Sequence, residues 1–369
     1  MKNTQKYKII ILAGSLRQSG SITWAVSLVR AFCQQGHEAV LLVMGSRGEA
    51  YLPINLQTII LGKARTNILV KIYHLLLLRK IYKSGYKRLE EWVYNRRAKK
   101  FLTHFEKSSP VDLIIKDFNT PTPAVFTGKK HLAILHEKVS VADQETCKRT
   151  QDPYTKIAAV SESCAGGCRK NGVDVHHVLY NPLDVEEIRK RAEAFTVNDD
   201  YVVFVGALID RKNVTALLEA WYCSGIQQKL YFIGRGEKQK ILGKRAQELG
   251  VADRVVFTGF APNPYPFIKS AKALILPSHE EPMGYVCFEA LALDTPVIVA
   301  GFESATEFYD QDSIVALTPK ESFNARLAKA IINTVQHKQN DQHLLDKNSA
   351  IKNMSYPNVV KNYLQFMNM

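Results

Sequence analysis

The stretch YVVFVGALIDRKNVTALLEAWYCSGIQQKLYFIG, residues 201–234, decides the fold of this chain. It opens with an apolar run, Tyr201–Gly206, crosses a polar loop, continues as a helical pattern over Val214–Trp221 and ends in a second apolar run, Leu230–Ile233. Neither run alternates apolar with polar residues, so both faces of the predicted strands are expected to be covered. The order strand, loop, helix, strand predicts one crossover unit of a parallel sheet.

The same order of elements extends in both directions from this stretch. Downstream we predict helices at Lys238–Leu249 and Tyr285–Ala292 and strands at Val255–Phe257, Ala273–Leu276 and Val297–Val299. Upstream we predict a strand at Lys8–Ala13, a loop at Gly14–Ser21, a helix at 22–35 and strands at Glu38–Met44, Leu113–Ile115, Leu132–Leu135 and Ala158–Val160. A last helix is expected at Tyr356–Met367. The chain is therefore predicted to be α/β, with two parallel-sheet domains.

The domain limits follow from this order of strands and helices and from the total length of 369 residues. We predict an N-terminal domain at 1–181, a C-terminal domain at 182–345 and a C-terminal helical segment, 346–369, returning to the N-terminal domain. The boundary is expected near Asn181-Pro182-Leu183-Asp184. The N-terminal domain would carry a basic insert at 63–100.

The charge of the chain is concentrated in that insert. Lys and Arg number 49 against 35 Asp and Glu, a formal net charge of +14, and residues 63–100 hold 12 cations and 2 acids, so 12 − 2 = +10 lies there. The hydrophobic fraction of 46% excludes a mainly disordered chain. The longest apolar run in this region, Ile72–Leu78, is far shorter than the roughly 20 residues that a spanning helix needs.

Two smaller patterns in the first half have more than one interpretation. The loop from Gly14 to Ser21, with Gly20 near the helix start, is either a ligand loop or a plain turn, since it matches neither G-x-G-x-x-G nor the phosphate-binding G-K-S/T pattern. The six cysteines have no disulfide-framework spacing, and Cys164 and Cys168 are one helical step apart. We predict reduced structural thiols.

The candidate ligand-binding residues lie in strand-to-helix loops of the second half. Arg211 and Lys212 lie in one of them, and adjacent cations there suit a diphosphate, although a solvated pair is the plain alternative. Gly234, Gly236 and Gly259 each come directly after predicted strands. The loops of parallel strands meet at one edge of the sheet, where ligands of such folds bind.

The strongest signal is Glu281 followed eight residues later by Glu289, with a Pro-and-Gly turn between them. Carboxylates accept hydrogen bonds from sugar hydroxyls, whereas backbone amides near Met283–Val286 would stabilise phosphate. The arrangement suits a sugar nucleotide, and a solvated pair of acids is the alternative.

Together these residues resemble a family. Gly206 with Arg211-Lys212-Asn213, the Gly234/Gly236 loop, Gly259-Phe260, Pro277-Ser278, Glu281-x7-Glu289 and Thr295-Pro296 follow the order and spacing of the family-4 retaining glycosyltransferases. That resemblance implies the GT-B fold, in which two Rossmann-like domains face a cleft. It covers residues 181–299 best and leaves 47–110 unmatched. The chain has Ala207 where the family usually has Arg.

The resemblance also implies roles for single residues. Glu281 would face the donor sugar, Arg211 and Lys212 would hold the diphosphate and stabilise the leaving group, and His136 would line the reaction centre. Donor-binding positions would be Gly20, Gly206, Gly234, Gly236, Phe260, Met283, Gly284, Tyr285, Val286 and Glu289. The family needs no metal or other cofactor, and Asp310-Gln311-Asp312 is expected to be a surface turn.

Three interpretations of the 63–100 insert remain: a partly buried helix pair, a surface for an anionic membrane, or a nucleic-acid site. Cations mixed with leucines and aromatics favour the membrane, and no nucleic-acid motif accompanies them. We therefore expect a cytoplasmic protein, peripheral on the inner face of the cytoplasmic membrane.

The predicted activity is a retaining, metal-independent hexosyl- or N-acetylhexosaminyl-transferase. It would move a sugar from a nucleotide diphosphate donor, UDP being favoured, to a saccharide acceptor of a lipopolysaccharide or other lipid-linked surface glycan. The alternatives are an inactive GT-B scaffold that binds nucleic acid or a protein partner, and a sugar-nucleotide epimerase.

Overall fold

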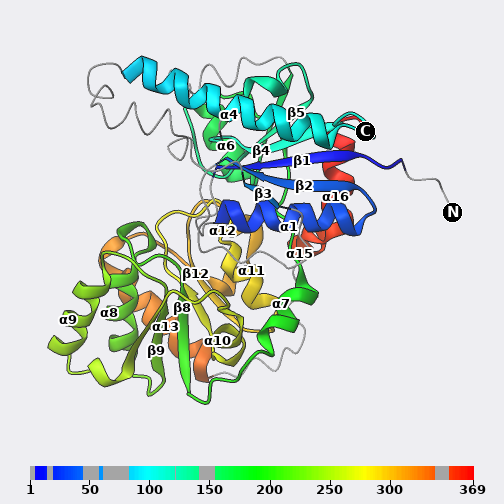
Figure 1. The fold of residues 1–369 in the computed structure, drawn as a ribbon. Coiled ribbons are helices and arrows are strands. Elements are labelled where there is room, and N and C mark those ends of the chain that lie inside the picture. Colours follow the sequence, from blue (N-terminus) through cyan, green and yellow to red (C-terminus); the bar gives the residue numbers. More distant parts are fainter. Residues whose placement is uncertain are drawn as a thin grey trace. The chain divides into compact units, whose positions relative to one another are not determined.

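The chain forms two compact units in a computed structural model that describes residues 5–14, 20–44, 58–60, 83–120, 122–140, 154–336 and 349–369. Unit 1 comprises Met1–Val160, Cys164–Pro182 and Tyr356–Met369, and unit 2 comprises Ser161–Ser163 and Leu183–Ser355. The break after Pro182 lies beside the predicted boundary, whereas unit 2 extends to Ser355 rather than to residue 345. Figure 1 shows the elements of both units.

Unit 1 is built on a parallel sheet, which has seven strands within the described residues, in the order β3-β2-β1-β4-β5-β6-β7. Every residue of the first strand, β1, is buried, which explains why its sequence shows no polar alternation. The strands are β1 Lys8–Ala13, β2 Glu38–Val43, β3 Thr58–Ile60, β4 Leu113–Asp117, β5 His131–Leu135, β6 Thr155–Ala159 and β7 His177–Val178.

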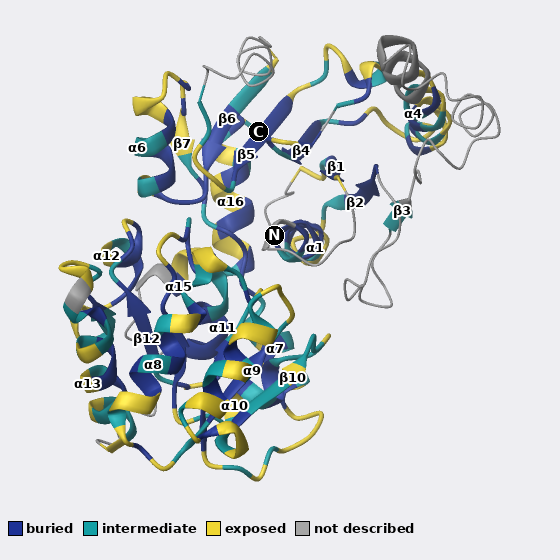
Figure 2. Cartoon of the chain, turned by 90° about the vertical axis from the view of Figure 1, so that its left-hand side faces the viewer, coloured by how far each residue is buried: buried dark blue, intermediate teal, exposed yellow. Residues whose placement is uncertain are grey.

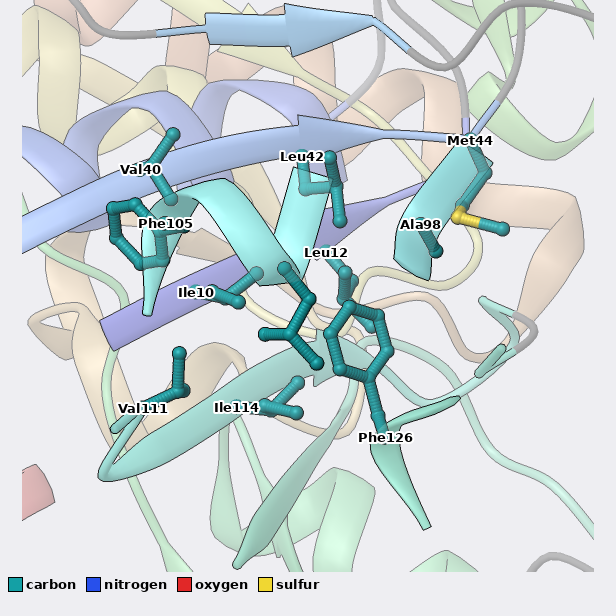
Figure 3. Packing of buried hydrophobic residues seen from close by; sticks show 11 residues of the cluster. Ile10, Leu12, Val40, Leu42, Met44, Ala98, Phe105, Val111, Ile114 and Phe126 are labelled. Carbon is teal, nitrogen blue, oxygen red and sulfur yellow. The ribbon is translucent and has the colours of Figure 1, made fainter. Parts of the chain in front are cut away.

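Helices cover both faces of this sheet. Helix α4 (Lys83–Phe105) packs on one face, where Ala98 and Phe105 meet Ile10, Leu42 and Phe126 in one apolar cluster (Figure 3). Helix α6 (Glu162–Lys170) packs on the same face farther along the sheet, as the strand register shows. Helices α1 (Gly20–Gln34) and α16 (Tyr356–Phe366) contact each other on the other face. The short helix η2 is Ala124–Phe126.

Unit 2 repeats this architecture with a parallel sheet of six strands in the order β10-β9-β8-β11-β12-β13. Its strands are β8 Tyr201–Val205, β9 Lys229–Ile233, β10 Val255–Gly259, β11 Leu274–Leu276, β12 Val297–Ala300 and β13 Ile314–Val315. Its α-helices are α7 Val185–Ala192, α8 Val214–Ser224, α9 Gln239–Glu248, α10 Tyr265–Ser270, α11 Tyr285–Leu291, α12 Ala305–Phe308, α13 Phe323–Gln336 and α15 Ser349–Met354. Short 3-10 helices are η3 Asp210–Lys212, η4 Ala252–Arg254, η5 Gln311–Ser313 and η6 Lys320–Ser322.

The central strands of both sheets are buried, whereas the edge strands β3, β7 and β10 are partly exposed and the helices expose their outer sides, as Figure 2 shows. The two-domain α/β prediction is therefore confirmed, with small differences at element ends. Helix α1 begins at Gly20, two residues before the predicted start, and α8 continues to Ser224. Across the described ranges, no helix has both the length and the apolar character needed to span a membrane. Residues 63–82 of the insert lie outside the described residues.

Candidate active site

Three loops of unit 2 lie against one another at the carboxyl edge of its sheet. They follow β8, β9 and β10, and backbone hydrogen bonds link them. The N–H of Gly206 donates to the carbonyl of Ile233 over 2.9 Å, and the N–H of Gly234 donates to that of Gly259 over 2.8 Å. The N–H of Leu208 in turn donates to the carbonyl of Arg235 over 3.0 Å. The backbones of the three loops therefore contact one another directly.

Glycine is required where these loops touch. A Cβ atom on Gly234 would lie 1.8 Å from the carbonyl oxygen of Gly206, and one on Gly236 would lie 2.2 Å from that of Leu208. The φ angle of Gly234, 147°, is also one that other residues rarely adopt. The structure thus brings together Gly206, Gly234 and Gly236, three of the predicted donor-binding positions.

The two predicted cations have different surroundings although they are adjacent in η3. Lys212 is largely buried and its ammonium forms an ion pair with the carboxylate of Glu281. Arg211 is exposed and donates a hydrogen bond to the carbonyl of Glu280 over 3.3 Å. Lys212 is held inside by an acid, whereas Arg211 reaches solvent. The two cations are therefore suited to different oxygens of a bound diphosphate.

The carboxylate of Glu281 is buried and held from several directions. The hydroxyl of Ser278 donates to its Oε1 atom over 2.7 Å, and the hydroxyl of Ser304 donates to its backbone carbonyl over 2.8 Å. Both serines are fully buried. With Lys212 beside it, the carboxylate has a fixed orientation before any ligand arrives, which is the preorganisation that catalysis by electrostatics requires.

The turn between the two glutamates is held by Tyr309. Its hydroxyl donates to the carbonyl oxygens of Met283 and Gly284, at 3.0 and 3.1 Å. Gly284 has a φ of 69°, and a Cβ there would lie 2.9 Å from the same hydroxyl oxygen. Met283 and Gly284 are buried, whereas Tyr285 and Val286, which begin α11, are partly exposed.

Glu289 lies in the fifth position of α11 and is also buried. Burial raises the pKa of its carboxyl to about 7, although the hydrogen bond from the Tyr265 hydroxyl, 3.1 Å long, and the charge of Arg191 oppose that rise. The Arg191 guanidinium lies over the Tyr265 ring at 4.8 Å. Glu289 is therefore poised to change its charge near neutral pH.

His136 belongs to unit 1 and follows β5 directly. Its ring meets the ring of Trp24 edge-on, with centroids 4.8 Å apart, and its Nε2 atom is 4.0 Å from a carboxylate oxygen of Asp117. Burial lowers the pKa of His136 to about 3, so the imidazole is neutral at physiological pH. The indole N–H of Trp24 donates to the hydroxyl of Tyr363, 3.2 Å away on α16.

The remaining predicted positions are placed less tightly. Phe260 follows Gly259 and is partly exposed. Gly20 begins α1, but the loop residues 15–19 lie outside the described residues, so the ligand-loop prediction stays a prediction. Asp310 and Asp312 are exposed beside and within η5, as expected for a surface turn. Among the described residues no three His, Cys, Asp or Glu side chains are grouped to hold a metal ion.

Sequence reasoning missed the residues that hold these groups in place. Ser304 and Tyr309 lie on the segment after β12, and Tyr265 begins α10, and each is more than 20 residues along the chain from the residue that its hydroxyl contacts. Ser278 was visible only as part of the Pro277-Ser278 motif. Trp24 had no signal beyond its place on an apolar helix face. None of these contacts has a fixed spacing that a single sequence could reveal.

Comparison with known proteins finds relatives of the second unit. Residues 185–350 match the family "Glycosyl transferases group 1". The chain is 34% identical over 115 residues to the lipopolysaccharide core biosynthesis glycosyltransferase LpsD of Rhizobium meliloti, covering 31% of this chain and 33% of that protein. It is 28% identical over 150 residues to a Campylobacter jejuni enzyme named N-acetylgalactosamine-N,N'-diacetylbacillosaminyl-diphospho-undecaprenol 4-alpha-N-acetylgalactosaminyltransferase, covering 40% of this chain and 41% of that one. The chain thus matches about a third to two fifths of these relatives' lengths.

Solved structures extend the likeness to the whole fold. Anabaena HepE in complex with UDP and glucose has a TM-score of 0.70 at 16% identity, covering 98% of this chain and 99% of that one. WaaG, a glycosyltransferase involved in lipopolysaccharide biosynthesis, has a TM-score of 0.64 at 14% identity, covering 96% and 98%. The predicted GT-B fold class and the resemblance to this group of glycosyltransferases are both confirmed.

Proposed function

Because residues 185–350 match the glycosyl transferases group 1, we propose that this chain transfers a sugar from a nucleotide diphosphate donor to a saccharide acceptor. The observation that carries the proposal is the buried pair of Lys212 and Glu281 beside the glycine loops. A buried charge pair is costly to form, so its presence at the ligand-binding edge of the sheet favours a chemical role over a structural one.

The chemistry follows from where charge develops. As the bond between the sugar and the diphosphate breaks, negative charge grows on the leaving phosphate, and Lys212 and Arg211 are the cations that would stabilise it. The glycines of the loops after β8 and β9 would let the diphosphate approach the backbone closely. Glu281 would accept hydrogen bonds from the sugar hydroxyls, and Glu289 from the ribose hydroxyls. We propose catalysis without a metal ion, since side chains supply the positive charge, and retention of configuration because the resemblance to the family-4 retaining glycosyltransferases implies it.

The donor and acceptor are proposed from the neighbours. HepE was solved with UDP and glucose, which supports a UDP-sugar and a hexosyl group, whereas the Campylobacter relative is named an N-acetylgalactosaminyltransferase, which supports an N-acetylhexosaminyl group. The relative LpsD is named for lipopolysaccharide core biosynthesis, and the Campylobacter relative for a diphospho-undecaprenol saccharide. These names support an acceptor that is a lipopolysaccharide or another lipid-linked surface glycan.

A lipid-linked acceptor requires that the enzyme work at a membrane, and helix α4 offers a surface for it. Trp92, 46% exposed, carries the guanidinium of Arg96 over its ring at 5.4 Å. Lys99 and Lys100 lie on the exposed side of the same helix. The single acidic residue of the described range 92–107, Glu106, is paired with Lys129. Cations beside an exposed aromatic ring suit an anionic membrane surface. We therefore propose peripheral binding to the inner face of the cytoplasmic membrane.

A donor panel tests the activity. Purified protein is incubated with UDP-, GDP-, ADP- and dTDP-sugars, and released nucleotide diphosphate is measured with and without lipid-linked glycan acceptors. We expect slow release from one donor class, faster release with acceptor, and loss of both in Glu281→Ala. Inactivity with every donor and acceptor, together with no nucleotide-dependent shift in the unfolding temperature, would overturn the proposal. Interconversion of the donor sugar without transfer would identify an epimerase instead.

Vesicle binding tests the location. Wild-type protein should sediment with vesicles containing phosphatidylglycerol but not with neutral vesicles, and the binding should weaken with salt. Changing Arg96, Lys99 and Lys100 together to Glu should abolish sedimentation while leaving transfer to a soluble acceptor intact. Tighter, salt-sensitive binding to RNA or DNA than to these vesicles would contradict the membrane assignment.

A further inference from the structure

The two cysteines of α6 hold the segment that carries His136. The thiol of Cys164 donates to the carbonyl of Leu135, and the thiol of Cys168 donates to that of Glu137, each over 3.6 Å. The N–H of Val139 donates to the sulfur of Cys168 over 3.4 Å. Sulfur hydrogen bonds are individually weak, but these three contact the backbone on both sides of His136.

A glycine between the cysteines completes this contact. A Cβ atom on Gly167 would lie 2.6 Å from Cδ of Lys138 and 2.8 Å from its Cγ and Cε, so the lysine stem crosses α6 where the helix has no side chain. The neighbouring Gly166 differs, since a Cβ there would meet no atom within 4 Å. Asn171 adds a hydrogen bond from its amide to the carbonyl of Val139 over 3.4 Å.

The other side of the same segment contacts α1. Leu135 faces the apolar cluster that includes Cys164 and Cys168. Because successive side chains point to opposite faces, His136 is directed to the face of α1, where its ring meets Trp24. Residues 135–139 are thus held by α6 through their backbone and by α1 through the histidine ring.

We propose that Cys164, Gly167 and Cys168 form a seat on α6 that fixes the backbone of residues 135–139 and thereby positions His136 for sugar transfer. The inference rests on the proposed function and on the role that the family resemblance implies for His136, which would line the reaction centre. The cysteines are positioning residues, which act through the histidine and need no contact with the donor. Buried thiols suit this task, since sulfur can both donate to a carbonyl and accept from an N–H while it packs as an apolar group.

The test compares Gly167→Ala with Gly166→Ala. Both changes raise helix propensity by the same amount, but only the first displaces Lys138. We expect Gly167→Ala to lower kcat ~10-fold with little change in the KM for the donor, as a small misplacement of a reacting group does. The His136 imidazole, followed by NMR in protein labelled at histidine, should titrate closer to the ordinary value in Gly167→Ala. Gly166→Ala should match wild type in both measurements.

A second pair of variants tests the thiols themselves. Cys168→Ala removes a donor and an acceptor, so it should reproduce the effect of Gly167→Ala, and Cys168→Ser should restore part of kcat because a hydroxyl keeps both functions. Unchanged kcat and an unchanged His136 titration in Gly167→Ala and Cys168→Ala, with the folded state intact, would overturn the seat. The titration requires no substrate, so absent transferase activity would overturn the proposed function while the NMR result still decides whether the seat holds His136.

Discussion

The two units place their predicted functional groups by different means. In unit 2 the loops after β8, β9 and β10 contact one another through backbone atoms, and glycines allow that contact. In unit 1 the segment with His136 is held by side chains, the thiols of α6 and the indole of Trp24. A backbone-built site tolerates no added atom, whereas a side-chain-built site depends on residues that can shift. The two sites should therefore respond differently to small changes.

The largest effect is expected from Gly234→Ala. The added methyl group would overlap the Gly206 carbonyl, and the φ of 147° adds strain, so the two loops must separate. We expect a loss of several kcal/mol of stability (about 3 or more) and no detectable nucleotide binding. Differential scanning calorimetry and calorimetric nucleotide titration measure both. Gly243→Ala, inside α9 where a Cβ would meet nothing within 4 Å, is the control and should keep wild-type nucleotide binding with a stability equal to wild type or higher by up to about 1 kcal/mol.

Replacing the carboxylate of unit 2 should have the next largest effect. Glu281→Gln keeps the shape and a hydrogen-bond acceptor for Ser278 but leaves Lys212 without its counter-charge. We expect kcat/KM to fall by about 10²- to 10³-fold, the usual loss for one preorganised electrostatic group.

Two comparisons make the measurement specific. The double variant with Lys212→Met should lose far less than the sum of the single effects, because the two groups act as one unit. Asp210→Asn, which breaks the more exposed pair with Lys238, should change activity little. Equal losses in Glu281→Gln and Asp210→Asn would contradict the role given to the buried pair.

A pH dependence should come from Glu289 in unit 2. The pKa of Glu289 is about 7 in the folded protein against an ordinary value of 4.5, so the folded state binds the proton more tightly than the unfolded state. Stability should therefore fall as pH rises from 4.5 through 7, by about 3 kcal/mol from this group. Nucleotide affinity should rise over the same range, since the ionised carboxylate is the better acceptor for ribose hydroxyls.

Denaturant unfolding at several pH values measures this change. In Glu289→Gln the fall in stability that comes from this carboxyl group should vanish. The stability of the variant relative to wild type should therefore increase as the pH is raised. Between pH 5 and 6.5, His136 in unit 1 should add a slope of the opposite sign, because burial lowers its pKa from 6.5 to about 3 and the imidazole takes up a proton only in the unfolded state. A nucleotide affinity that is flat across neutral pH would contradict the role proposed for Glu289.

The smallest effect is expected at the support of Trp24. Tyr363→Phe removes the acceptor of the buried indole N–H, which should cost about 1 kcal/mol and lower the unfolding temperature slightly. The cost of Trp24→Phe should be smaller in the Tyr363→Phe background than in wild type. Additive costs would mean that the hydrogen bond between α1 and α16 contributes nothing.

The same contrast explains what could be predicted from sequence. Buried strands such as β1 appear as unbroken apolar runs, and the glycines of unit 2 follow those runs directly, so the fold and the position of the glycine loops could be predicted. Glu281 and Glu289 were visible because one turn separates them. Tyr265 and Ser304 were not, since hydrogen bonds between distant segments leave no spacing in a sequence. Cys164 and Cys168 showed their helical step but not that the thiols reach the His136 segment.

The position of α16 has a consequence for synthesis of the chain. Unit 1 is completed by residues 356–369, which reach Trp24 and Phe32 on α1 only after unit 2, residues 183–355, has been made. At roughly 5–20 residues per second, that interval is on the order of 10–35 s. For that time the apolar side of α1 lacks its covering helix on the ribosome. Nascent chains stalled near residue 340 should therefore be cleaved by protease within α1. Chains that are stalled only after Met369 has left the ribosome should resist cleavage there.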